Sequence, residues 1–152
     1  MDIGSGTGFP SASLSNFAPH PFVIDGVECA SMEGFLQSLK FSSPDMQKAV
    51  CQLVGKAAKF KGKKKKWWRT QTLYWQGKEI SRHSEEYQQL LDRAFDALAQ
   101  NASFQKALLA TGESTLTHSI GKTNPSETVL TRSEFCSRLM RIRHRLREAE
   151  GR

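Results

Sequence analysis

Long apolar runs, paired cysteines and clustered metal ligands are all missing from this sequence. No apolar run approaches the roughly 18 residues that a membrane-spanning helix needs, so we expect no membrane span. The first thirteen residues have neither a basic nor an apolar segment, which argues against a signal peptide. The cysteines Cys29, Cys51 and Cys136 are odd in number and widely spaced. This usage favours reduced thiols and a cytoplasmic location.

Several chemical motifs are also lacking. No C-x-x-C pair and no His, Cys or Asp cluster has the spacing of a metal site, so we expect no metal and no cofactor. No G-x-S-x-G elbow surrounds Ser114, so we do not expect a serine nucleophile there. The glycine-rich segment 4–8 has too little chain before it to follow a strand, as a phosphate-binding loop would. We expect it to be a flexible lead-in.

Length and composition predict one folded domain. The 152 residues suit a single domain. A chain of this size buries roughly two thirds of its unfolded surface, so it needs no disulfide or metal to fold. No internal repeat and no linker divides it, so we treat 1–152 as one unit.

The charge is strongly positive, with 22 Lys and Arg against 15 Asp and Glu. Most of the excess lies in two runs, 59–69 and 138–147. Such runs indicate a polyanionic partner, namely nucleic acid, a phosphorylated nucleotide or a membrane surface. The alternative is a solvated basic face that only aids solubility. Because aromatic residues adjoin the first run, we favour anion binding.

The first half of the chain is predicted to form a hairpin followed by two helices. Asp25-Gly26 is a hairpin turn signal. Ser31 suits the N-cap of the first helix, and Pro44 ends it. The expected elements are a loop over 1–13, strands over 21–25 and 27–30, and helices over 32–41 and 45–60. The inner face expected for the second helix is Ala49, Val50, Leu53 and Val54.

The second half is predicted to be mostly helical. Ser84 caps a long helix with apolar residues at helical spacing, and Thr131 or Ser133 caps the last helix. Residues 72–78 suit either a strand or a helix extension. The other expectations are a basic loop or irregular helix over 59–69, helices over 85–101, 104–111 and 134–150, an extended segment over 115–119, a polar loop over 120–128, and fraying over 144–152. These elements predict an α+β domain that is predominantly α-helical, with a small N-terminal β-hairpin.

Glu33, Gln37 and Lys40 form one polar stripe on the predicted helix 32–41, since positions four and seven apart share a helix face. A carboxylate and an ammonium group on one face can act as an acid–base pair. The lysine could instead attack a sugar carbonyl as a nucleophile. The alternative is an exposed stripe with weak side-chain pairing.

Residues on either side of this helix could contact a ligand. Asn16 offers an amide and Phe17 a stacking face, although they also suit a turn residue and a core anchor. Trp67 and Trp68 follow a run of lysines, a combination that suits a phosphate with an attached base or sugar. A basic surface loop anchored by one buried tryptophan is the alternative. The expected anion-binding residues are Lys63, Lys64 and Arg69. His118 is a further substrate-binding candidate, though a single histidine in that position is more often structural.

The stretch 14–41, LSNFAPHPFVIDGVECASMEGFLQSLKF, resembles the opening of the NADAR (YbiA-like) family. That family combines Ser-Asn-Phe, a hairpin ending in a small residue, Ser/Thr-x-Glu, and then Gln and Lys-Phe. The matching positions are Asn16, Phe17, Glu33, Gln37, Lys40 and Phe41. Later parts of the family pattern are similar to the segments 55–62 and 107–119 and to the tryptophan pair. The resemblance therefore spans about 9–143.

The resemblance implies a hydrolase that cleaves the N-glycosidic bond between ribose and a base. Members remove ADP-ribose from guanine in nucleic acid, or act on ribosylated pyrimidine intermediates of riboflavin synthesis. It implies Glu33 as a polar catalytic residue and Lys40 as a base or sugar-trapping nucleophile. It also implies substrate contacts from Asn16 and from Trp67 or Trp68. The expected substrate is therefore ADP-ribosylated nucleic acid or a ribosylated nucleotide-like molecule. The alternatives are phosphoribosylated riboflavin intermediates and non-catalytic binding of ADP-ribose or nucleic acid.

The sequence departs from the family pattern near residues 117–128. Many members carry an acidic residue and then a Trp-Gly, glycine-rich loop before the last helix. Here His118 and Gly121 stand in for part of that loop, and the Trp-Gly pair is missing. We expect this segment to set the substrate preference.

Overall fold

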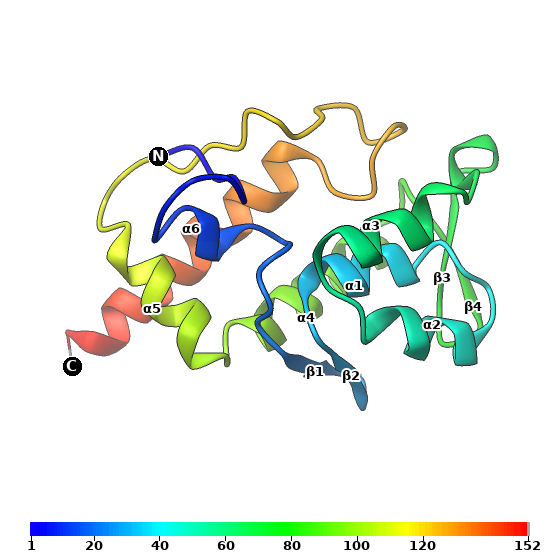
Figure 1. Ribbon diagram of the computed structural model, residues 1–152, viewed down its shortest axis with the longest axis horizontal. Coiled ribbons are helices and arrows are strands. Elements are labelled where there is room, and N and C mark those ends of the chain that lie inside the picture. The colour runs from blue at the N-terminus through cyan, green and yellow to red at the C-terminus, as the bar shows by residue number, and fades with distance from the viewer. Residues whose placement is uncertain (152) are drawn as a thin grey trace.

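The computed structural model describes residues 1–151 and has an α+β architecture dominated by helices (Figure 1). The helices are α1 (Met32–Ser38), α2 (Pro44–Cys51), α3 (Gly55–Lys63), α4 (Glu85–Leu98), α5 (Ala102–Ala110) and α6 (Arg132–Glu150), with 3-10 turns η1 (Ala12–Leu14) and η2 (Trp67–Arg69). The strands are β1 (Phe22–Ile24), β2 (Val27–Cys29), β3 (Thr72–Trp75) and β4 (Lys78–Ser81). No helix within 1–151 is both long and apolar enough to cross a membrane.

Two antiparallel hairpins supply all the named strands of the described chain. In the first, Phe22 faces Cys29, and Asp25 and Gly26 turn the chain with positive φ angles of 49° and 77°. The turn predicted at Asp25-Gly26 is confirmed. The second hairpin turns at Gln76-Gly77 in the same way, with φ angles of 51° and 85°. Residues 72–78, which the sequence left open, therefore enter a hairpin rather than a helix.

The single helix predicted over 45–60 is wrong, because the chain breaks into α2 and α3. Helix α2 ends at Cys51, and α3 begins at Gly55, which has a φ of +53°, a left-handed conformation that glycine adopts readily. The break changes which residues face inward: Val50 is buried, but Ala49 and Val54 are exposed. The segment 59–69, expected as a basic loop or an irregular helix, is partly helical, because α3 continues to Lys63 and η2 covers Trp67–Arg69.

Both ends of the described chain are bonded to other parts of the fold. Ile3, in the loop expected over 1–13, is buried, and its N–H donates to the Thr117 carbonyl at 2.8 Å. At the other end, α6 continues to Glu150, as expected for the helix over 134–150, and residue 152 of the segment 144–152 lies outside the described residues. On this helix, Arg147 donates to the Gly112 carbonyl at 2.9 Å, which ties the helix to the end of α5.

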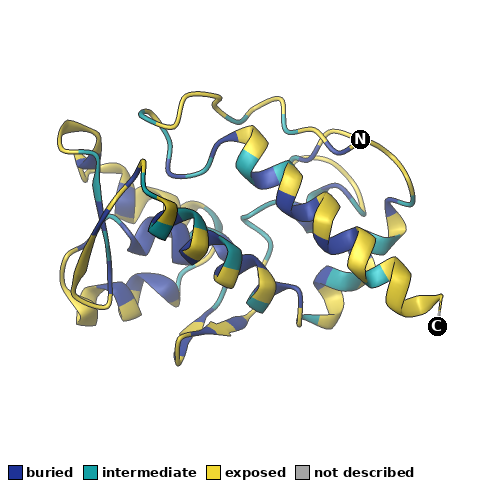
Figure 2. Cartoon of the chain, turned by 180° about the vertical axis from the view of Figure 1, so that it is seen from behind, coloured by how far each residue is buried: buried dark blue, intermediate teal, exposed yellow. Residues whose placement is uncertain are grey.

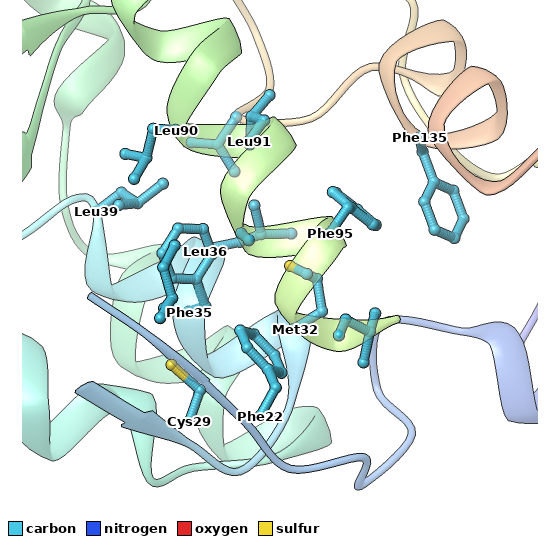
Figure 3. Packing of buried hydrophobic residues seen from close by; sticks show 14 of the residues in the cluster. Phe22, Cys29, Met32, Phe35, Leu36, Leu39, Leu90, Leu91, Phe95 and Phe135 are labelled. Atoms are coloured by element: carbon cyan, nitrogen blue, oxygen red, sulfur yellow. The ribbon is translucent and has the colours of Figure 1, made fainter. Parts of the chain in front are cut away.

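The core lies where α1 crosses α4. Figure 3 shows Phe35 and Leu36 of α1, and Leu39 directly after it, beside Leu90, Leu91 and Phe95 of α4. The buried stripe of each helix in Figure 2 faces inward, so apolar burial fixes the orientation of both helices. The polar residues of the first predicted motif therefore begin on a helix whose position is fixed by the hydrophobic core.

The arginines of α6 are largely paired within the fold. Arg138 and Arg141 lie 2.9 Å and 3.3 Å from the Asp92 carboxylate of α4, and Arg145 lies 2.7 Å from Asp96. Arg143 is buried and donates to the Thr111 hydroxyl at 2.7 Å. The charge of the run 138–147 thus joins α6 to α4 and α5, and it forms less of a free anion-binding surface than the sequence suggested.

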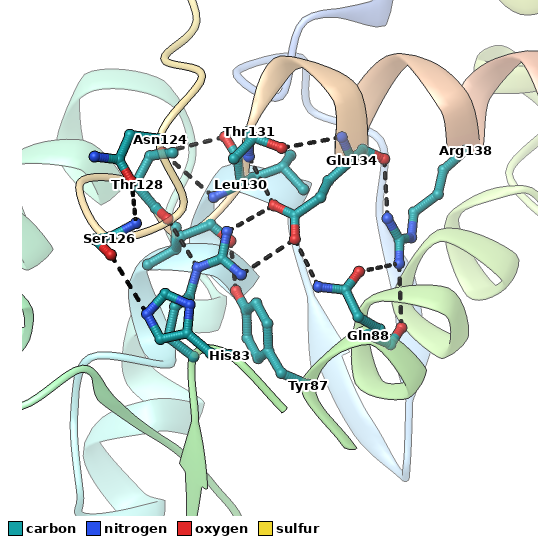
Figure 4. Close-up of polar contacts among 12 residues, drawn as sticks. His83, Tyr87, Gln88, Asn124, Ser126, Thr128, Leu130, Thr131, Glu134 and Arg138 are labelled. Carbon is teal, nitrogen blue, oxygen red and sulfur yellow. Dashed lines mark hydrogen bonds and ion pairs between the residues drawn. The ribbon is translucent and has the colours of Figure 1, made fainter. Parts of the chain in front are cut away.

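A buried ion pair anchors the segment that precedes α6 (Figure 4). Arg82 is 1% exposed and its two terminal nitrogens donate to Glu134 at 2.6 Å and 3.1 Å. Its Nε donates to the Thr128 carbonyl at 2.9 Å, and the Tyr87 hydroxyl donates to the Val129 carbonyl at 2.6 Å. These bonds hold residues 128–129 against α4, and α6 begins with a Thr131–Glu134 capping box.

Acid should destabilise the protein through Glu134. Burial acts to raise the pKa of Glu134, but hydrogen bonds from Arg82, the Thr131 backbone and Gln88 outweigh it, and the pKa lies below the ordinary 4.5. A carboxylate with a lowered folded-state pKa adds stability above its unfolded value, and this stability is lost as pH falls through the folded value. We expect the midpoint of urea unfolding to fall below about pH 4.5. Glu134→Gln should lose this component of the pH dependence, and an unchanged profile in this variant would contradict the assignment.

Candidate active site

A cleft of about 550 Å³ brings the first predicted motif together with later parts of the chain. Its lining comes from the 15–17 segment, α1, α3, η2 and the loop 118–130. The lining residues are Ser5, Ser15, Asn16, Phe17, Glu33, Leu36, Gln37, Lys40, Lys59, Lys63, Lys65, Trp67, Trp68, His118, Ile120, Gly121, Lys122, Glu127, Thr128, Val129 and Leu130. Its volume lies within the range of roughly 300–1,000 Å³ typical of small-molecule sites.

Glu33 is fixed in the first turn of α1 from two sides. The Ser31 hydroxyl caps the helix by accepting from the Gly34 N–H at 3.1 Å, as the sequence predicted. The backbone N–H of Glu33 donates to the Asn16 carbonyl at 3.0 Å. This bond joins the Ser-Asn-Phe segment to α1, which explains why two motifs far apart in the sequence line one cleft.

The side chain of Gln37 orients the Glu33 carboxylate. Its Nε2 donates to Glu33 Oε1 at 2.9 Å, while its own buried Oε1 has no hydrogen-bond partner in the described chain. The Gln37 amide lies directly against Gly62 of α3, where an added Cβ would come within 1.9 Å of Oε1. Gly62 therefore leaves the space in which Gln37 contacts Glu33.

Gly62→Ala should lower activity more than stability. The new methyl group would displace the Gln37 amide, because the atom it meets is the movable end of that side chain. Glu33 would then lose its hydrogen bond, and precise placement of a catalytic group is worth up to about 100-fold in rate. We expect kcat to fall while the melting temperature changes little. A variant with full kcat would show that Gln37 does not position Glu33.

Lys40 lies just beyond α1, not on its face as predicted. The helix ends at Ser38, and the Lys40 N–H donates to the Gln37 carbonyl at 3.2 Å in a tighter final turn. Such tightening is common at helix ends. The side chains of Glu33 and Lys40 are nevertheless both half-buried and line the same cleft.

The surroundings of the cleft bring the pKa values of Glu33 and Lys40 closer to each other. Burial raises the pKa of Glu33 above its ordinary value, opposed by the Gln37 hydrogen bond and the charges of Lys40 and Lys59. Burial lowers the pKa of Lys40, which Glu33 opposes and Lys122 reinforces. A carboxyl that holds its proton longer and an amine that loses it sooner are suited to proton transfer.

Most of the other predicted site residues also reach the cleft. Asn16, Phe17, Lys63 and both tryptophans line it, whereas Lys64 and Arg69 do not. The tryptophans differ sharply in exposure, since Trp67 is 8% exposed and Trp68 is 53% exposed. Trp67 is thus largely buried, whereas Trp68 is exposed, with the Arg69 guanidinium 5.5 Å from the centre of its ring.

His118 lines the cleft and also holds its wall in place. Its Nδ1 lies 2.9 Å from the Ile3 carbonyl, and its ring packs edge-on against Phe135 with the centroids 5.1 Å apart. The histidine therefore has a structural role in addition to any contact with a ligand.

Seven polar residues of the cleft were not among the candidates from the sequence: Ser5, Ser15, Lys59, Lys65, Lys122, Glu127 and Thr128. Lys59 lies four residues before the predicted anion-binding residue Lys63, so helical spacing could have identified Lys59 as a residue of the site. The loop residues Lys122 and Glu127 have no periodic pattern, and bonds to distant parts of the fold, such as the one from Gln71 to the Ser126 carbonyl at 2.9 Å, hold their loop in place. No group of three or more His, Cys, Asp and Glu side chains in 1–151 could hold a metal ion.

Comparisons with known proteins agree with this architecture. The family model described as bacteriophage protein GP30.3 matches residues 8–144. An uncharacterized 17.1 kDa protein from the Gp30–rIII intergenic region of Enterobacteria phage T4 is 38% identical over 151 residues, covering 96% of this chain and 98% of that protein. The NMR structure of the E. coli protein YbiA superposes with a TM-score of 0.64 and 18% identity, covering 99% of this chain and 86% of YbiA.

These similarities differ in what they establish. At 18% identity, the likeness to YbiA shows the fold, and it confirms the YbiA-like α+β fold predicted from the sequence. The phage protein is similar along nearly its whole length, and the family model covers most of the chain. The chain belongs to the GP30.3 family of bacteriophage proteins.

Proposed function

We propose that this protein is an N-glycosidase that removes ADP-ribose from modified guanine in nucleic acid. The observation that carries the proposal is the pair of half-buried groups, Glu33 and Lys40, in one cleft at the opening motif that resembles the NADAR family. The YbiA-like fold supports the resemblance beyond the motif. The activity and the substrate are both parts of the proposal.

The lining of the cleft suits an anionic sugar nucleotide. Four lysines line it besides Lys40, namely Lys59, Lys63, Lys65 and Lys122. Positive side chains suit a pyrophosphate, and Phe17 and Trp68 offer aromatic surface to a base or sugar. A small neutral substrate would make no use of these charges.

Glu33 and Lys40 take complementary roles in the proposed reaction. The Lys40 amine attacks C1′ of the ribose as the bond from C1′ to the base breaks. The bonding electron pair leaves with the base, which takes its proton from the Glu33 carboxyl. The proton lost by the amine restores that carboxyl, the sugar ring opens to an imine, and water then releases the sugar and the free amine. The shifts of both pKa values support these protonation states.

A release assay tests the proposed activity. The protein is incubated with single-stranded DNA that carries ADP-ribosylated guanosine, and free ADP-ribose is measured. We expect release of ADP-ribose and restoration of guanine. Retained binding without release would instead identify a non-catalytic ADP-ribose-binding module, and cleavage of phosphoribosylated pyrimidines alone would favour the riboflavin-type substrate.

Borohydride trapping should distinguish the roles open to Lys40. A reducing agent converts an imine into a stable amine, so reaction with substrate should leave the protein heavier by the reduced ADP-ribose unit. Lys40→Ala should lose both the adduct and the turnover, and mass spectrometry of the intact protein measures the adduct. Turnover in the wild-type protein without any adduct would assign Lys40 as a base instead of a nucleophile.

A further inference from the structure

The segment from Lys56 to Arg69, which we call the α3–η2 face, gathers a dense group of cations that form no ion pair with other described residues. Between Asp45 and Glu79 the sequence has no acidic residue. The cations of the face are Lys56, Lys59, Lys61, Lys63, Lys64, Lys65, Lys66 and Arg69, and none forms an ion pair with another described residue. The arginines of α6 contrast with it, because most of them pair with acidic residues.

Two aromatic rings lie exposed among these cations. Phe60 is 57% exposed and Trp68 is 53% exposed. Lys63 lies 5.8 Å from the centre of the Phe60 ring, and Arg69 lies 5.5 Å from that of Trp68. Exposed aromatic residues flanked by cations are the arrangement with which proteins bind unpaired nucleic-acid bases.

These side chains point outward because the opposite side of α3 is buried. Ala58 and Gly62, four residues apart, are buried and turn one stripe of the helix toward α1. Lys56 and Phe60 are four residues apart on the outer side, and Lys63 and Lys64 follow within the next turn. Phe60 therefore lies within a row of lysines and makes no contribution to the buried core.

The α3–η2 face continues directly into the cleft. Lys59, Lys63, Lys65 and Trp68 belong to the face and also line the cleft. A strand with one nucleotide in the cleft would therefore meet the face with its neighbouring nucleotides.

We infer that the α3–η2 face binds the single-stranded nucleic acid that flanks the modified nucleotide. The lysines contact the phosphates, and bases stack on Phe60 and Trp68. Stacking requires free base faces, which a duplex keeps buried within its own stack, so the face selects an unpaired strand. This inference rests on the proposed function, because it names the form in which the nucleic acid reaches the cleft.

Fluorescence anisotropy with unmodified, labelled oligonucleotides tests the inference without any ADP-ribose. We expect the single strand to bind at least tenfold more tightly than the matching duplex. The logarithm of the affinity should fall linearly with the logarithm of salt concentration, with a slope of about −0.7 for each phosphate contacted. Equal affinity for the duplex, or binding only to vesicles of anionic phospholipid, would overturn the inference.

Phe60 provides a matched set of variants, since it lies outside the cleft and the core. Phe60→Ala and Phe60→Leu should each weaken single-strand binding by roughly tenfold, as expected for the loss of one base stack. Phe60→Tyr keeps the ring face and should bind as the wild type does. If Phe60→Leu binds normally, the ring is not a stacking platform and the inference fails.

A pair of charge variants separates the free cations from the paired ones. Lys56→Ala with Lys61→Ala should reduce the salt slope, because both lysines lie on the α3–η2 face. Arg141→Ala with Arg145→Ala removes the same formal charge from α6 and should leave the slope unchanged. Equal effects of the two pairs would show that net charge alone drives binding.

Failure of this inference can be told apart from failure of the proposed function. Release of ADP-ribose from a modified mononucleoside, together with no binding to unmodified strands, would refute the inference alone. Strand binding that depends on Phe60, together with no release from any substrate, would refute the proposed activity alone.

Discussion

Glu33→Gln should reduce the release of ADP-ribose by roughly 100- to 10,000-fold, the range that general acid catalysis typically contributes. Glutamine keeps the shape of the side chain and can still pair with the Gln37 amide, but it has no proton to donate to the departing base. Single-turnover kinetics with modified DNA should place the loss in the chemical step. Binding of ADP-ribose should stay within a few-fold of the wild type.

Stability provides the control for this variant. Because burial raises the pKa of Glu33, its surroundings disfavour the ionised form, which glutamine cannot adopt. A raised folded-state pKa adds stability only at low pH, and this stability is lost as pH rises through the folded value. We therefore expect Glu33→Gln to melt at the same temperature as the wild type or higher at pH 7. Full activity in this variant would refute the assignment of Glu33.

Glu134→Ala should destabilise the protein by about 3–5 kcal/mol, the usual cost of leaving a buried charge without its partner. Arg82 is almost fully buried and has no other carboxylate within ion-pair distance among the described residues. For a domain of about 150 residues this loss lowers the melting temperature by roughly 6–20 °C. Calorimetry or thermal circular dichroism measures the shift.

A double variant separates the buried charge from the packing around it. Arg82→Met with Glu134→Leu removes both charges and fills similar volume, so it should lose less stability than Glu134→Ala alone. If the double variant is the less stable of the two, the hydrogen bond from Arg82 to Thr128 matters more than the charge pair. Either variant should also loosen the loop 118–130, which hydrogen exchange of its backbone amides would detect.

Local sequence patterns determined the secondary structure wherever it depends on side chains within one turn of the chain or on one face of a helix. The turn at Asp25-Gly26, the Ser31 cap and the apolar stripe of α4 all depend on residues close in the chain, and all are present. The pattern failed between Cys51 and Gly55, because the apolar spacing continued through residues at which the backbone leaves the helix. The pattern gave no indication that Ile3 is buried, because its partners, such as Thr117 and His118, are distant in the chain.

The first half of the candidate site was predictable because its residues lie in one short stretch, 14–41, with a family pattern. The second half was not, because the loop 118–130 has neither periodicity nor the Trp-Gly pair of the family. Its place beside the cleft depends on Arg82 and Tyr87, which bind its carbonyl groups from the other side of the fold.

The charge of the protein was likewise predictable only in part from the sequence. Composition alone determined that the chain is strongly basic and that two runs carry the excess. Only the tertiary structure decided that the two runs differ, because α6 packs beside the aspartates of α4 whereas α3 has no acidic neighbour within ion-pair distance in the described residues. The sequence determines which residues are charged, but pairing depends on distances between segments that meet only when the chain has folded.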